Sequence, residues 1–254
     1  MSVTTTKDGH VAVVTFARPP HNFADLALIE AIGAAFDACD ADAQVRAILL
    51  RSEGRVFCAG ADLVNANPVA DGVKEERNPF YVAAAKLFGV GKPVVAQVQG
   101  SAVGAGLGLS LVADFRVAAP EARFVANFVQ LGFHPGFGIS AVLERIVGKQ
   151  RAHLMLLTGR RIGGEQAFEW GLADQLAPLD GLDAAAMALA QEIATGAPLA
   201  VRSTRATLRG DLRALVERQT DHELAEQAWL QKTRDFAEGV KAVVERRPGR
   251  FTGE

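Results

Sequence analysis

The chain has 254 residues, of which 49% are hydrophobic and 22% are charged, and its formal net charge is −2. This balance is typical of a globular protein, gives no basic surface for nucleic acid, and leaves no apolar run of the ~18 residues that a membrane span needs. The N-terminus lacks the apolar core of a signal peptide, and the two cysteines, Cys39 and Cys58, lack metal-ligand spacing. We therefore expect a cytoplasmic protein without a metal or a nucleic-acid or membrane partner.

Strand-like and helix-like segments alternate over the first two-thirds of the chain. Such alternation predicts βαβ units and a largely parallel, buried sheet. Asp25 precedes the first helical pattern and is its candidate N-cap. The strand-like segments are residues 10–16, 45–50, 93–98 and 115–118, and the helix-like segments are 25–39, 80–88, 106–112 and 139–147.

The last third carries helical patterns almost without strands between them. They predict an α/β core over residues 1–195, followed by a helical C-terminal region over residues 196–254. Arginines in this region favour a solvated helix face, with a pocket for a phosphorylated ligand as the alternative. The helical patterns span residues 151–157, 165–170, 183–194, 198–209 and 212–236, and the arginines are Arg202, Arg205, Arg209 and Arg213.

A glycine-rich run, Gly100 to Gly108, follows a predicted strand and opens a predicted helix. Backbone N–H groups in that position can face negative charge on a ligand. The run does not fit a dinucleotide fingerprint, because Leu109 stands where the third glycine should be, and it contains no Gly-Lys-Ser/Thr of a P-loop. The alternative is that these glycines only allow a helix and a strand to pack closely.

A second run of small residues, Phe57 to Leu63, also follows a strand-like stretch and leads into a polar loop. Alone, it could be a tight turn at the exit of a strand. Together, two such turns after two strands of one sheet could direct two backbone N–H groups at a single oxygen atom. That arrangement is an oxyanion hole.

These and other segments, in their order along the chain, resemble the crotonase (enoyl-CoA hydratase/isomerase) superfamily. The similarity runs from about residue 11 to residue 253. Ala17 departs from the family pattern, which has Asn at this position. The matching segments are Arg18-Pro19-Pro20-His21-Asn22, Phe57–Leu63, Gly100–Asp114, Leu157–Ile162, Gly171–Asp174 and Glu238-Gly239 through Phe251.

The resemblance implies a ββα spiral core, a C-terminal helical trimerisation region, and a homo-oligomer that is a trimer or a dimer of trimers. It implies an acyl-CoA thioester as substrate, with coenzyme A as part of the substrate and no separate cofactor. The family polarises the thioester carbonyl with two backbone N–H groups, which by motif position belong to Ala61 and Ala105. The other expected substrate-binding residues are Ala59, Gly60, Asp62, Leu63, Gly104 and Phe128.

The sequence departs from the family at the two glutamates with which its hydratases handle water and a proton. Those positions are Gly108 and Phe128. Each positioned acid or base contributes roughly 10²- to 10⁴-fold in rate, so we expect a poor hydratase of simple enoyl-CoA esters. The oxyanion hole remains, which leaves open an isomerase, decarboxylase, hydrolase or lyase, or a non-catalytic acyl-CoA-binding protein.

His134 is the candidate replacement acid or base, because it follows the Phe128 position in a loop and its unperturbed pKa suits proton transfer. Alternatively, it only hydrogen-bonds a backbone carbonyl. Asp62 is expected to organise its loop or contact the coenzyme, with acid–base catalysis as the lesser alternative. Residues Glu75, Glu76 and Tyr81 lie in a segment that lines the acyl pocket in relatives, and are expected at the surface.

Overall fold

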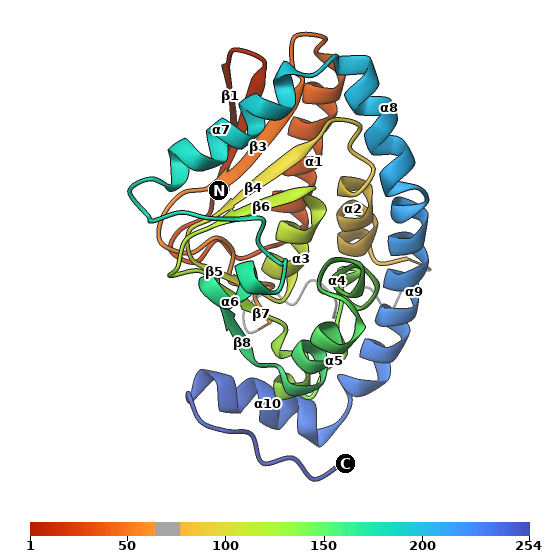
Figure 1. Cartoon of the computed structure of the whole chain (residues 1–254). Coiled ribbons are helices and arrows are strands. Elements are labelled where there is room, and N and C mark those ends of the chain that lie inside the picture. The colour runs from red at the N-terminus through yellow and green to blue at the C-terminus, as the bar shows by residue number, and fades with distance from the viewer. Residues whose placement is uncertain (64–76) are drawn as a thin grey trace.

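The computed structural model describes residues 1–63 and 77–254 of the chain (Figure 1). Its centre is a six-stranded sheet in the order β1-β2-β3-β4-β6-β9, in which every neighbouring pair is parallel except β1 and β2. The predicted parallel sheet is therefore confirmed. The strands are β1 (Ser2–Asp8), β2 (Val11–Ala17), β3 (Ala47–Ser52), β4 (Val94–Val98), β6 (Phe115–Ala118) and β9 (Gln175–Leu176).

Successive residues of the central strands point to opposite faces of the sheet, and both faces are buried. One face packs against α7 (Leu182–Thr195), and the other belongs to the main core with α1 (Leu26–Ala41) (Figure 1). In β2, for example, Val13 lies on the α7 side and Val14 in the main core. Burial on both faces explains why these strands read as apolar runs without alternation.

A smaller three-stranded sheet has the order β5-β7-β8. Its first strand, β5, follows β4 of the main sheet directly along the chain. Its strands are β5 (Ser101–Val103), β7 (Arg123–Val125) and β8 (Arg161–Gly163). The helices around the two sheets are α2 (Pro79–Leu87), α3 (Ala105–Val112), the 3₁₀ helix η2 (Asn127–Leu131), α4 (Ile139–Val147), α5 (Lys149–Thr158) and α6 (Gly164–Glu169).

The C-terminal helices α8 (Pro198–Arg209) and α9 (Leu212–Leu230) run along one edge of the molecule, and α10 (Arg234–Val244) crosses its end (Figure 1). The helical pattern over residues 212–236 predicted one continuous helix, which is wrong. Helix α9 ends at Leu230, and α10 begins after Thr233, its N-cap. The Thr233 hydroxyl accepts a hydrogen bond from the amide of Phe236 at 3.1 Å.

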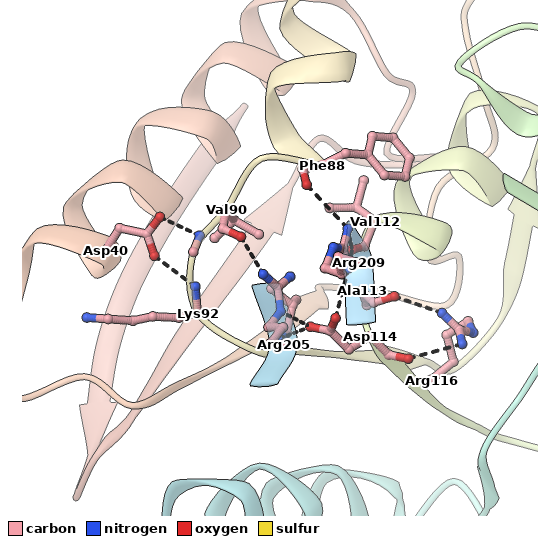
Figure 2. A network of polar contacts seen from close by, with 12 residues as sticks. Asp40, Phe88, Val90, Lys92, Val112, Ala113, Asp114, Arg116, Arg205 and Arg209 are labelled. Carbon is pink, nitrogen blue, oxygen red and sulfur yellow. Dashed lines mark hydrogen bonds and ion pairs between the residues drawn. The ribbon is translucent and has the colours of Figure 1, made fainter. Parts of the chain in front are cut away.

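Arg205 of α8 is buried and Arg209 is half-buried, so the prediction that they form a solvated face is wrong for them. Arg205 and Arg209 both bind the carboxylate of Asp114, each at 2.8 Å (Figure 2). Arg205 also donates to the carbonyl of Val90, and Arg209 to that of Val112. The network ties α8 to the segments that precede β4 and β6, and the two guanidinium groups share the carboxylate of Asp114.

Among the described residues, no single helix is long and apolar enough to cross a membrane. One bent pair, Leu182–Thr195 with Pro198–Leu230, passes that test by length and composition.

Candidate active site

The two small-residue segments lie side by side. The amide of Cys58 donates to the carbonyl of Ser101 at 3.0 Å, and the amide of Val103 donates to the carbonyl of Cys58 at 3.0 Å. Gly106 permits this approach, since a Cβ atom on it would lie 2.8 Å from the carbonyl carbon of Cys58. The glycine thus serves close packing, and the same packing brings the two predicted oxyanion segments together.

The amides of Ala61 and Ala105 are the two donors that the resemblance selects. Ala105 is the first residue of α3, where an amide has no partner within the helix and faces outward with the positive end of the helix dipole. Gly60 brings the Ala61 turn against this terminus, because a Cβ atom on Gly60 would lie 3.8 Å from the Ala105 nitrogen. The hydrogen bonds of the described residues give neither amide an acceptor, so both remain available for a ligand oxygen.

The Arg18–Asn22 segment is hydrogen-bonded to the chain that leads into Ala61. The side chain of buried Asn22 accepts from the amide of Arg18 at 2.7 Å and donates to the carbonyls of Glu53 and Val56, each at 2.8 Å. The carbonyl of His21 accepts from the amide of Ala59 at 3.0 Å. This motif therefore acts in the described structure by holding the first oxyanion segment in place.

A cavity of about 250 Å³ opens beside the two amides, and its walls are mainly apolar. It is lined by the expected residues Ala59, Gly60, Ala61, Asp62, Leu63, Gly104, Ala105 and Phe128. Tyr81, from the segment that lines the acyl pocket in relatives, also lines the cavity. The wall is completed by Phe23, Phe80, Val103, Asn127, Leu131, Phe133, Gly136, Phe137, Gln227, Val240, Val243 and Val244.

The positions of the two absent glutamates are filled by apolar groups. The ring of Phe128 lies next to the oxyanion segment, since a Cβ atom on Gly104 would be 3.7 Å from its Cζ atom. Space beside Gly108 is occupied by the side chain of Phe137, which is buried. A water molecule at either position would find no carboxylate there to activate it.

Besides Asp62 and Asn127, the polar side chains of Tyr81 and Gln227 interrupt the apolar wall. Tyr81 is almost completely buried, contrary to the expectation that it lies at the surface, and its hydroxyl donates to Oε1 of Gln227 at 2.7 Å. Burial raises the pKa of the Tyr81 phenol, as does the nearby carboxyl of Glu223. Gln227 was missed by the sequence analysis because it sits in a helical pattern rich in polar residues, far along the chain from every motif.

His134 does not line the cavity beside Ala61 and Ala105. Its ring lines a second cavity together with His153 and Trp229, and it packs edge-on against His222 at 5.8 Å between ring centroids. Its Nδ1 is 2.9 Å from the carbonyl oxygen of Pro135, in line with the alternative that it hydrogen-bonds the backbone. The structure therefore does not bring His134 together with the predicted oxyanion residues, and its catalytic role stays a prediction.

Glu223 is fully buried behind the loop that precedes α4. Its carboxyl accepts from the amides of Gly138 at 2.7 Å and Ser140 at 3.2 Å, and from the Ser140 hydroxyl at 2.5 Å. Burial raises its pKa to about 7, while these hydrogen bonds act in the opposite direction. The carboxyl caps α4 and fixes the loop that carries Gly136 and Phe137 into the cavity wall.

Titratable side chains around the cavity are few. Among the described residues that line it, only Asp62 and Tyr81 titrate, and Glu75 and Glu76 lie outside the described residues. The described part of the chain also contains no group of three or more His, Cys, Asp or Glu side chains that could hold a metal ion. The site thus offers two amide donors, an apolar cavity and one carboxylate.

Comparisons with known proteins identify the family. A family model described as enoyl-CoA hydratase/isomerase matches residues 6–254. The chain is 35% identical over 221 residues to the 1,2-epoxyphenylacetyl-CoA isomerase of Escherichia coli, covering 84% of this chain and 83% of the relative. It is 35% identical over 252 residues to the mevalonyl-coenzyme A hydratase of Beauveria bassiana, covering 94% and 90%.

Among solved structures, the enoyl-CoA hydratase/isomerase of Pseudoalteromonas atlantica superimposes with a TM-score of 0.87 at 27% identity, over 99% of this chain and 100% of that one. The fold, with its mixed α/β core and helical C-terminal region, is thus the crotonase fold. The family match covers nearly the whole chain and includes both oxyanion segments. The chain belongs to the enoyl-CoA hydratase/isomerase family of the crotonase superfamily.

Proposed function

We propose that this enzyme binds acyl-CoA thioesters and stabilises an enolate intermediate between the amides of Ala61 and Ala105. The observation that carries this proposal is the position of the two amides, which lie at adjoining segments on the wall of one apolar cavity. A removed oxyanion donor costs about 10²- to 10³-fold in turnover, so a pair of such donors supports catalysis and not only binding.

The reaction that fits the cavity best is a proton shift within the acyl group, as in isomerisation. Water addition would need a group to activate water, and Gly108 and Phe128 cannot do so. The apolar rings around the cavity favour an apolar acyl chain. One of the relatives named above acts as an isomerase, which points in the same direction.

Asp62 is the first candidate for moving the proton. It lines the cavity beside Ala61, whereas His134 lines another one. A carboxylate at the edge of an apolar site can act as a general base if it comes within hydrogen-bond reach of the proton that it removes. The sequence hypothesis that gave this role to His134 remains the alternative and is tested by the paired variants in the Discussion.

We further propose that the protein works as a homo-oligomer, a trimer or a dimer of trimers. On α9, Val216 is fully buried within the chain and adds nothing to an exposed apolar surface. Support comes from large apolar side chains that are exposed on α5, α9 and α10. Leu157 is 74% exposed, Trp229 55% and Val244 61%.

Two assays test the proposed reaction. Hexenoyl-CoA with the double bond at C3 is incubated with the enzyme to follow its conversion to the conjugated ester, and crotonyl-CoA is incubated to follow hydration. We expect isomerisation to exceed hydration by at least about 100-fold, because one water-activating group alone contributes roughly that factor. Fast hydration of crotonyl-CoA would refute the proposed reaction. Binding of both esters without turnover of either would identify a non-catalytic acyl-CoA-binding protein instead.

A further inference from the structure

A buried pair of polar side chains forms part of the wall of the otherwise apolar cavity. Tyr81 comes from α2 and Gln227 from α9, and both line the cavity. Tyr81 is 6% exposed and Gln227 is 0% exposed, so water satisfies little of their hydrogen-bonding capacity. Neither element carries one of the predicted oxyanion amides, so the pair adds a second polar element to the same cavity.

The orientation of the Gln227 amide is fixed by its surroundings. Its Nε2 donates to the carbonyl oxygens of His134 at 2.9 Å and Pro135 at 3.2 Å. Turning the amide over would place Oε1 against two carbonyl oxygens, which is repulsive. Oε1 must therefore face Tyr81, and the single phenolic hydrogen is used in the bond between them.

The pair has an acceptor but no donor left for a ligand. Both N–H groups of Gln227 and the O–H group of Tyr81 are already donated, so no donor is left over. Gln227 is fully buried, so the acceptor left for a ligand in the cavity is the phenolic oxygen of Tyr81. Burial raises the pKa of the phenol, so the hydroxyl keeps its proton, and the pair does not act as a base.

We infer that Tyr81 and Gln227 form an acceptor-only site that selects acyl groups carrying a hydroxyl beyond the reacting carbons. A hydroxyl can donate into this site, whereas a ketone or carboxylate would meet only acceptors. This inference rests on the proposed function, because it assumes that the cavity holds the acyl group of a CoA thioester. It makes the two residues determinants of specificity rather than catalytic residues.

Calorimetric titration tests the inference with hexanoyl-CoA, its 4-, 5- and 6-hydroxy derivatives and 5-oxohexanoyl-CoA. At least one hydroxy ester should bind about 5-fold more tightly than hexanoyl-CoA, which is the gain expected from one net hydrogen bond. The 5-oxo ester should bind more weakly than hexanoyl-CoA. In Tyr81→Phe the preference for the hydroxy ester should fall to within about 2-fold, whereas Val240→Ala, which alters the same wall without a polar group, should retain it.

Gln227→Leu provides an independent variant. It frees the phenolic hydrogen of Tyr81 to donate, so affinity for 5-oxohexanoyl-CoA should rise relative to that for hexanoyl-CoA. Equal affinity of the wild-type protein for hexanoyl-CoA and every hydroxy ester would overturn the inference, as would a preference that survives in Tyr81→Phe. Those results would leave the proposed function intact. Failure of hexanoyl-CoA and all its derivatives to bind would instead remove the proposed function and this inference with it.

Discussion

The side chain of Phe137 occupies the space that a side chain at position 108 would need. A Cβ atom on Gly108 would lie 2.5 Å from Cδ1 and 2.7 Å from Cγ of Phe137. Phe137 itself has a φ of 64°, a left-handed conformation that is strained for a bulky residue. The loss of a carboxylate at position 108 is thus coupled to an aromatic residue that fills its place.

This coupling predicts that a glutamate cannot simply be restored. Gly108→Glu should lower the free energy of unfolding by about 1–3 kcal/mol, because the new side chain overpacks a full core. The cost of Gly108→Glu should be smaller in a Phe137→Gly background, since glycine opens the space and adopts a positive φ freely. Chemical denaturation of the two single variants and the double variant measures the coupling. Additive effects would contradict the relationship.

The proton-transfer assignment is tested by two variants measured side by side. Asp62→Asn should reduce isomerisation of a 3-enoyl-CoA ester by about 10²-fold, because the carboxylate beside the oxyanion amides is removed. His134→Ala should leave turnover within a few-fold, since His134 lines the second cavity. The reverse pattern would return the catalytic role to His134, and the pH–rate profile of each variant would show which group titrates.

Glu223 should make stability depend on pH. Its pKa is about 7 in the folded protein, above the ordinary 4.5, so the unfolded chain ionises first as the pH rises. Its contribution to the free energy of unfolding is fully present below about pH 4.5 and is lost as the pH rises through about 7. Between pH 5 and 8 the wild-type protein should lose roughly 2 kcal/mol relative to Glu223→Gln. Parallel pH dependences of the two proteins would contradict this.

The Asp114 network should contribute stability and not ligand binding. Asp114→Asn leaves buried Arg205 and half-buried Arg209 without their counter-charge, so the free energy of unfolding should fall by about 3 kcal/mol. Asp211→Asn is the matched control, because the ion pair of Asp211 with Arg218 is exposed and should contribute less than about 1 kcal/mol. Affinity for acyl-CoA esters should be the same in both variants. A selective loss of affinity in Asp114→Asn would favour the phosphate-pocket alternative.

The sequence predicted those parts of the molecule that local pattern determines. Helices α4 and α8 and strand β6 have the predicted bounds, and Asp25 accepts from the amide of Leu28 as an N-cap. The strands of two or three residues carry too little periodicity to be recognised, and β1 is largely exposed and polar. Nor could sequence show that Arg205 is buried, because its burial depends on Asp114, which is distant in the chain.

In the site too, local motifs were predictable from the sequence and contacts between distant residues were not. Contiguous motifs predicted the segments that carry Ala61 and Ala105, and the fold brings these segments together. Contacts between distant elements were beyond prediction, as for Tyr81 with Gln227. The placement of His134 also depended on the path of the loop, which turns its ring toward His222 and away from the cavity.

The most direct test of the account concerns the Ala105 amide. Ala105→Pro removes this donor at the first position of a helix, where proline is tolerated because the amide has no helical partner. Lys149→Pro is the matched control, because Lys149 is also the first residue of a helix and also follows a glycine of positive φ.

The measurement is the ¹³C chemical shift of the thioester carbonyl in bound hexanoyl-CoA labelled at C1. Hydrogen bonds to the carbonyl oxygen draw electrons from its carbon and move the resonance downfield. The account predicts a downfield shift on binding to the wild-type protein and to Lys149→Pro, and a clearly smaller shift in Ala105→Pro. An equal shift in all three proteins, or none in the wild type, would contradict the assignment of the oxyanion hole.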